Sequence, residues 1–64
     1  MLRIEIKTGN AAFRNEDDEF DAYYGGKEIK RILTEVVDDI QNGYETGSVN
    51  DINGNKVCEW ELTN

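Results

Sequence analysis

The stretch GKEIKRILTEVVDDIQN, residues 26–42, decides how this chain folds. Its apolar residues recur at intervals of three and four, which places them along one side of a helix. They are Ile29, Ile32, Leu33, Val36, Val37 and Ile40. Gly43 follows and can adopt the left-handed conformation that ends a helix. The pattern predicts an amphipathic helix over residues 26–42, and the rest of the chain must cover its apolar side.

The segment before the helix contains one strand. Residues 2–7, LRIEIK, alternate between apolar and charged side chains, which is typical of a half-buried strand. Phe13, in a small apolar island, is expected to anchor the core. The paired glycines Gly25 and Gly26 are expected to prevent the helix from starting earlier, because glycine is a poor helix former.

The segment after the helix, residues 48–62, has the features of a β-hairpin. Asn53-Gly54 separates two extended runs, which favours a two-residue type I′ turn at positions 53–54. That register pairs Asp51 with Lys56 and Val49 with Cys58. A three-residue loop with a glycine bulge is the alternative, and it would shift these pairings by one residue.

These elements predict a single small α+β domain over residues 1–64, in the order β-α-β-β. One helix would pack across one face of a three-stranded sheet. The favoured strand order is 2-3-1, with the last strand in the centre; a parallel arrangement in the order 1-2-3 is the alternative. The predicted core consists of Leu2, Ile4, Ile6, Phe13, Ile29, Ile32, Leu33, Val36, Val37, Ile40, Val49, Cys58, Trp60 and Leu62.

Composition restricts the classes of function. Fourteen acidic residues against seven basic ones give a net charge of −7, which argues against direct binding to nucleic acid. The first residues lack the apolar run of a signal peptide, no segment is long enough to span a membrane, and Cys58 is the only cysteine. We therefore expect a cytoplasmic protein without membrane contact.

No catalytic, cofactor or metal site is predicted. The chain has no histidine, and Cys58 alternates with Glu59 on the expected core face, so it is expected to be a small buried hydrophobe. Placing Gly54 at the sixth position of a calcium-binding loop puts Trp60 at the twelfth, where a glutamate is required. A glycine-rich helix start at residues 25–27 could hold an anion, but the acidic segment beside it disfavours phosphate.

The acidic residues are concentrated in two segments. Residues 14–21, RNEDDEFD, show neither helical nor strand periodicity and predict an exposed acidic loop. The helix carries bases in its first turns and acids in its last turns, the reverse of what its dipole prefers. Two explanations are open: the loop neutralises the basic helix end, or the acids contact a basic partner. The candidate contact residues are Glu16, Asp17, Asp18, Glu19, Asp21, Asp38 and Asp39.

Several short motifs together resemble those of small uncharacterised proteins encoded by phages, prophages and conjugative elements. They are Asn10-Ala11-Ala12-Phe13, Ile32-Leu33, Asn42-Gly43, Gly47 and the segment DINGNKV at residues 51–57. In that group a glycine commonly follows the valine, whereas Cys58 stands there in this chain. The resemblance implies a mobile-element setting and no catalytic residues.

These observations favour a non-enzymatic acidic protein that binds a basic protein partner. In a mobile element, the target would be the nucleic-acid-binding surface of a host protein, and the acidic protein would act as a DNA mimic or an inhibitor of defence. The alternative is a structural or regulatory homo-oligomer, such as a homodimer, of a phage or conjugative element. Its basis is a small core together with exposed aromatic residues.

Overall fold

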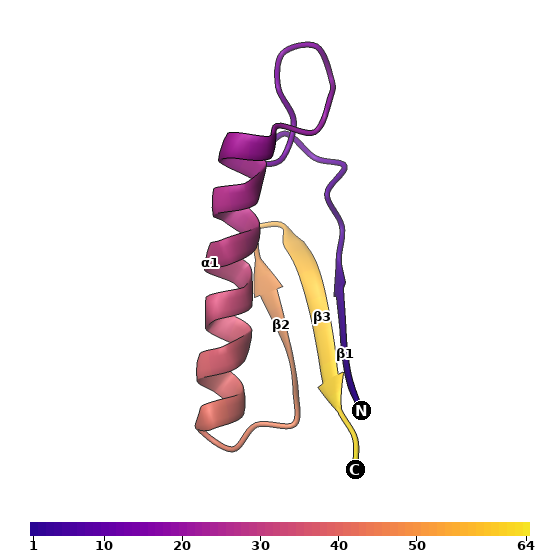
Figure 1. The fold of residues 1–64 in the computed structure, drawn as a ribbon, viewed down its shortest axis with the longest axis vertical. Helices are drawn as coiled ribbons and strands as arrows, with labels where there is room; N and C mark the ends of the chain where they lie inside the picture. The colour runs from indigo at the N-terminus through magenta and orange to yellow at the C-terminus, as the bar shows by residue number, and fades with distance from the viewer.

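A computed structural model describes all 64 residues of the chain. The elements are β1 (Leu2–Ile6), α1 (Ala22–Gln41), β2 (Thr46–Asn50) and β3 (Lys56–Leu62). The three strands form one sheet in the order β1-β3-β2, and both pairs are antiparallel (Figure 1). This confirms the predicted α+β class and the strand order 2-3-1, and it excludes the parallel alternative.

The helix begins four residues earlier than predicted. The Asp21 carboxylate accepts hydrogen bonds from the backbone amides of Tyr23 and Tyr24, both 2.9 Å long, and so caps the helix. Gly25 lies inside the first turns and is buried against the Phe20 ring. A Cβ at this position would approach that ring to 2.8 Å, so only glycine fits without a shift. The expectation that paired glycines delay the helix is therefore wrong: the cap and this close packing outweigh their low propensity.

The hairpin uses the three-residue loop rather than the type I′ turn. The Asp51 amide donates to the Asn55 carbonyl, the Gly54 amide donates to the Asp51 carbonyl, and Gly54 is the only loop residue with positive φ. Asn50 therefore pairs with Lys56, and the predicted Asp51–Lys56 pair is wrong. A register shift after Val49 restores the predicted pairing of Val49 with Cys58.

Replacing Gly54 with valine should destabilise the hairpin. Gly54 has a φ of +87°, and a side chain with a branched Cβ resists this conformation by about 1–2 kcal/mol. Gly9→Val is the matched control, because a Cβ at Gly9 or Gly54 would meet no atom within 4 Å and only Gly54 has positive φ. Thermal melts should show a clear loss for Gly54→Val alone; equal melts for both variants would contradict the assigned turn.

The buried core is smaller than predicted. Seven hydrophobic residues are buried: Phe13, Ile32, Val36, Val49, Val57, Cys58 and Trp60. Val57 was not predicted, and it is buried because the register shift gives β3 one extra residue opposite β2. Leu2, Leu33 and Val37 were predicted to be core residues, but they are exposed.

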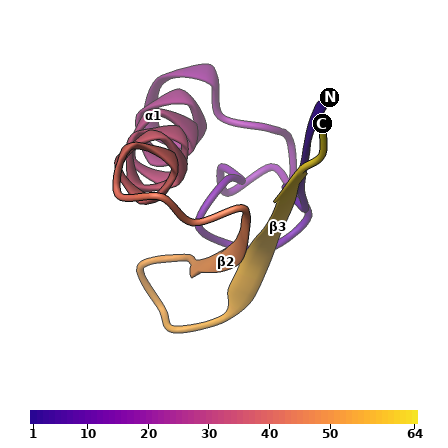
Figure 2. The ribbon, with the colours of Figure 1, turned by 90° about the horizontal axis from the view of Figure 1, so that it is seen from below.

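The position of the helix explains these exposed residues. α1 packs mainly against β2, at one edge of the sheet, and an end-on view shows the helix and β1 well separated (Figure 2). The chain measures 41 × 19 × 16 Å, with a radius of gyration of 12.4 Å, whereas a compact chain of 64 residues has about 11 Å. Its accessible surface is 4717 Å², against about 4,200 Å² for a typical monomer of this mass. The fold is therefore elongated, and Leu33 and Val37 of α1 lie beyond the reach of the sheet.

Candidate functional site

The acidic loop is an ordered hairpin-like turn that projects beyond the first turn of α1 (Figure 1). Arg14 and Phe20 form a backbone bridge at its base. The side-chain oxygen of Asn15 accepts hydrogen bonds from the amides of Asp17 and Glu19, at 2.9 and 3.1 Å. These contacts hold the backbone of residues 16–19, here called the acidic tip, in one conformation.

The four carboxylates of the acidic tip, on Glu16, Asp17, Asp18 and Glu19, are exposed and make no ion pair within the chain. The Arg14 side chain contacts the tip, but it donates to the backbone carbonyl of Asp18 rather than to a carboxylate. Arg31 forms its ion pairs with Glu28 and Glu35 of its own helix, at 2.6 and 3.0 Å. The tip thus does not neutralise the basic helix end by direct contact.

The other three predicted contact residues lie apart from the acidic tip. Asp21 caps α1, so its carboxylate already accepts two hydrogen bonds. Asp38 and Asp39 lie near the C-terminal end of α1, about 25 Å along the helix from Asp21. The predicted set therefore does not form one surface, and only the acidic tip is a continuous cluster.

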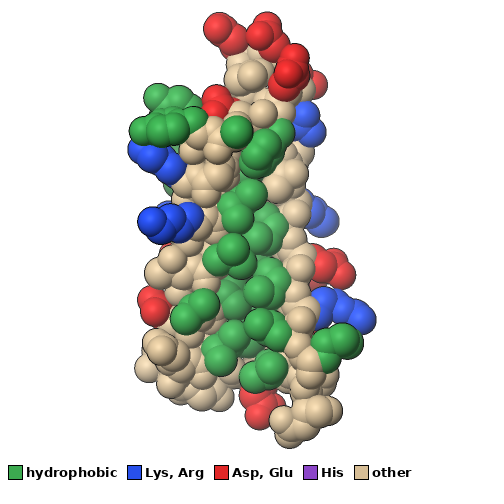
Figure 3. All heavy atoms as spheres, viewed as in Figure 1, with side chains coloured by type: hydrophobic (Ala, Val, Ile, Leu, Met, Phe, Trp, Pro, Cys, Tyr) green, Lys and Arg blue, Asp and Glu red, His purple; other side chains and the backbone are tan.

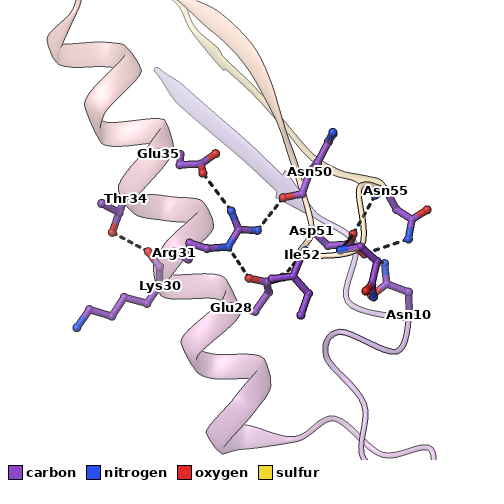
Figure 4. A network of polar contacts seen from close by, with 11 residues as sticks. Asn10, Glu28, Lys30, Arg31, Thr34, Glu35, Asn50, Asp51, Ile52 and Asn55 are labelled. Atoms are coloured by element: carbon purple, nitrogen blue, oxygen red, sulfur yellow. Dashed lines mark hydrogen bonds and ion pairs between the residues drawn. The ribbon is translucent and has the colours of Figure 1, made fainter.

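A buried polar network joins α1 to the hairpin (Figure 4). The carboxylate of Glu28 is buried and accepts hydrogen bonds from Arg31 Nε at 2.6 Å and from the Ile52 amide at 2.9 Å. The hydrogen bond from Arg31 is the main reason why the pKa of Glu28 lies below its ordinary value; burial opposes it, and the Ile52 amide adds to it. Arg31 also donates to the Asn50 carbonyl at 2.7 Å.

Asp51 is the second buried carboxylate, and it organises the hairpin loop. Its Oδ1 accepts from the amides of Asn53 and Asn55, both at 2.9 Å, and its Oδ2 accepts from the side-chain amides of Asn10 and Asn55. Burial alone would raise the pKa of Asp51, but these hydrogen bonds outweigh it and lower the pKa. Since both Asp51 and Glu28 are fully partnered within the chain, we assign them a structural role.

The remaining reactive group is a thiol in the core. The Cys58 thiol is buried, and burial together with the nearby charge of Glu59 raises its pKa, which keeps it protonated at neutral pH. No group of three or more histidine, cysteine, aspartate or glutamate side chains is placed to hold a metal ion. No helix combines the length and the apolar character needed to cross a membrane.

An uncovered band of hydrophobic side chains runs along the molecule between α1 and the strands (Figure 3). On the helix, a shallow hollow is lined by Gly26, Ile29, Lys30, Leu33, Thr34 and Val37. Leu33 is 37% exposed and Val37 is 51% exposed, and the half-buried residues packed beside the core are Ile4, Ile6, Ala12, Ile29, Ile40 and Leu62. We call this band the apolar groove. The helix residues of this groove were assigned to the core because of their spacing, so the groove was not predicted as an exposed surface.

Comparison of the chain with protein-family models, with curated proteins and with solved structures gave no match. The acidic tip and the apolar groove are the two surfaces that the geometry offers for binding.

Proposed function

We propose that this protein is a non-enzymatic binding protein that contacts a basic surface of another protein through the acidic tip. The observation that carries the proposal is the arrangement of the four tip carboxylates: they are exposed, clustered on an ordered loop and without an ion pair in the chain. Like charges held this close repel each other, and a basic partner relieves that repulsion.

The chemistry of the partner follows from the charge of the chain. A net charge of −7 repels phosphate, so the tip suits lysine and arginine side chains rather than nucleic acid. A protein surface that itself binds nucleic acid presents such side chains. The sharper form of the proposal is a mobile-element protein that occupies this surface on a host protein, as a DNA mimic or as an inhibitor of a defence nuclease. The mobile-element setting comes from the motif resemblance.

The binding experiment compares two variants that each lose three acids. The tip variant carries Glu16→Gln, Asp17→Asn and Glu19→Gln, and it leaves Asp18, with its positive φ, unchanged. The control carries Glu5→Gln, Glu45→Gln and Glu61→Gln, at exposed positions outside the tip and without ion pairs. Affinity purification from the native host across a salt series should recover the same basic partner with wild type and control, and not with the tip variant.

Recovery of that partner by the tip variant, or retention that does not weaken with salt, would contradict the proposal. Titration of the purified partner then gives the size of the effect. We expect a loss of affinity of roughly 3- to 150-fold for the tip variant, since each exposed charge contact contributes about 0.2–1 kcal/mol and three are removed together.

The tip variant should also melt at a slightly higher temperature than wild type at low salt. Removing like charges relieves repulsion in the folded loop, and the gain should vanish at high salt because exposed charges are screened. Melts of both proteins at low and high salt check this prediction. A lower melting temperature for the variant at low salt would indicate that the tip stabilises the fold and is not a contact surface.

A second candidate function is supported by a separate observation. The apolar groove favours a structural or regulatory homo-oligomer, because a small monomer rarely leaves a continuous apolar band exposed.

A further inference from the structure

The exposed stripe of α1 has the spacing of a helix-packing seam. Gly26, Lys30, Leu33, Val37 and Ile40 alternate at intervals of four and three residues, the repeat by which two helices pack side by side. A Cβ at Gly26 would meet nothing within 4 Å, so the surface beside it is open to a neighbouring helix. Ile32 and Val36, one step around the helix, already point into the core of the chain. The stripe is therefore available for a second helix.

Charges along the same helix run in one direction. Lys27 and Lys30 lie in its N-terminal half and Asp38 in its C-terminal half, all exposed and without an ion pair in the chain. Asp38 lies in the last turn, where the helix dipole disfavours an acid, so this order does not stabilise an isolated helix. An antiparallel neighbour with the same sequence would set each basic half against an acidic half, whereas a parallel copy would set like charges together.

We propose that a second copy of this chain covers the apolar groove, with the two α1 helices antiparallel about a two-fold axis near Leu33 and Thr34. Residues at equal distances from such an axis face each other. Lys30 and Asp38 each lie four positions from Thr34, so Lys30 faces Asp38 of the second copy on both sides of the axis. Leu33 and Val37 form the centre of the contact. The second copy also covers the half-buried strand residues that border the groove.

The shape of the molecule and the position of the acidic tips agree with this arrangement. The whole molecule measures 41 × 19 × 16 Å and α1 runs along its longest axis, so an antiparallel copy would lie along the length of the helix. The chain also exposes about 500 Å² more surface than a typical monomer of its mass. Antiparallel pairing places the two acidic tips at opposite ends, so they do not repel each other and stay free for the partner proposed above.

The first experiment measures association of the full chain by sedimentation equilibrium over a range of concentrations. Wild type should approach twice the mass of one chain, and Val37→Arg should weaken association at least tenfold while the helical circular dichroism is kept. Ile52→Arg is the control, because Ile52 is 72% exposed in the hairpin loop, outside the groove, and its replacement should leave association unchanged. A monomeric wild type at all concentrations would overturn the proposal.

The second experiment tests the antiparallel orientation by charge reversal. Lys30→Glu and Asp38→Lys should each weaken association, and the double variant should restore it. Positions 30 and 38 are about 12 Å apart in one helix, too far for an ion pair within the chain. Asp38→Lys also matches the helix dipole better than wild type, and Lys30 is exposed in the middle of the helix, so neither single variant should unfold the monomer. Singles that associate like wild type, or a double variant that is weaker than both, would overturn this orientation.

The two proposals fail separately. Neutralising the acidic tip should leave association unchanged, and Val37→Arg should leave the binding of a basic partner by the tip unchanged. Association that disappears with the tip variant would show that the tip belongs to the contact between copies, and it would overturn the geometry proposed here.

Discussion

Replacing Trp60 with alanine should leave most of the chain unfolded at room temperature. Its side chain is only 2% exposed, on the central strand, where Trp60 pairs with Ile4 of β1 and Gly47 of β2. Emptying a large aromatic site in a core costs about 3–5 kcal/mol. A single core in a chain this short rarely supplies more than that in total. Native-like chemical-shift dispersion in the alanine variant would contradict this expectation.

Two further substitutions separate the loss of packing from other effects. The Trp60 indole nitrogen is buried without a hydrogen-bond partner, so Trp60→Phe gives up no hydrogen bond and should keep the fold with a smaller loss. Tyr44→Ala removes an exposed ring and should change little. Urea unfolding of all three variants and wild type at one protein concentration gives the comparison, since association would couple stability to concentration.

The strands and the helix could be predicted because their signals are local. Alternation in residues 2–7 and the three-and-four spacing of the helix each identify an element without knowledge of the rest of the chain. The central place of β3 followed from its apolar residues Trp60 and Leu62. Periodicity shows which residues share a face, but it does not show how much of that face a neighbour covers. Leu33 and Val37 were therefore assigned to the core, and the apolar groove was missed.

The helix start and the hairpin turn depend on contacts between distant residues. Gly25 is accommodated in the helix because it packs against Phe20 and the Phe13 carbonyl, a contact that glycine propensity does not reveal. The loop at residues 52–54 is organised by the Asp51 carboxylate, which also binds Asn10, 41 positions away. The capping role of Asp21 was the one signal in the sequence that could have placed the helix start correctly.

The candidate site was predictable only where it is continuous in the chain. Glu16, Asp17, Asp18 and Glu19 lie together because they are neighbours in sequence. Asp38 and Asp39 were grouped with them by charge alone, and the length of α1 separates the two sets. The groove is bordered by residues of α1, β1 and β3, so its existence depends on how the helix is placed on the sheet, mainly against β2.

Changing Asp51 to asparagine should lower the melting temperature at neutral pH by roughly 5–15 °C. The asparagine oxygen can replace Oδ1 and keep both backbone hydrogen bonds, but its NH₂ group then faces the side-chain amides of Asn10 and Asn55. Turning Asn10 around does not help, because its own oxygen accepts from the Ala12 amide at 3.2 Å. The half-buried Asn10 amide would therefore lose its acceptor, whereas the exposed Asn55 side chain can turn toward water. Asp17→Asn, at an exposed position, is the control and should not lower the melting temperature.

The effect of Asp51→Asn should depend on pH. Hydrogen bonds lower the pKa of Asp51 in the folded chain below the value of about 3.9 for an unfolded aspartate, so its stabilisation is complete above that value. It is lost as the pH falls through the folded-state pKa, whereas the asparagine variant has no such group to titrate. The difference in melting temperature between wild type and variant should stay constant near neutral pH and shrink below about pH 4. Glu28, whose pKa is also lowered, makes both proteins acid-sensitive; because the charge of Asp51 raises the pKa of Glu28, its loss in the variant adds a smaller change that opposes this shrinkage. A difference that stays constant down to about pH 2 would mean that the charge of Asp51 does not hold the hairpin loop in place.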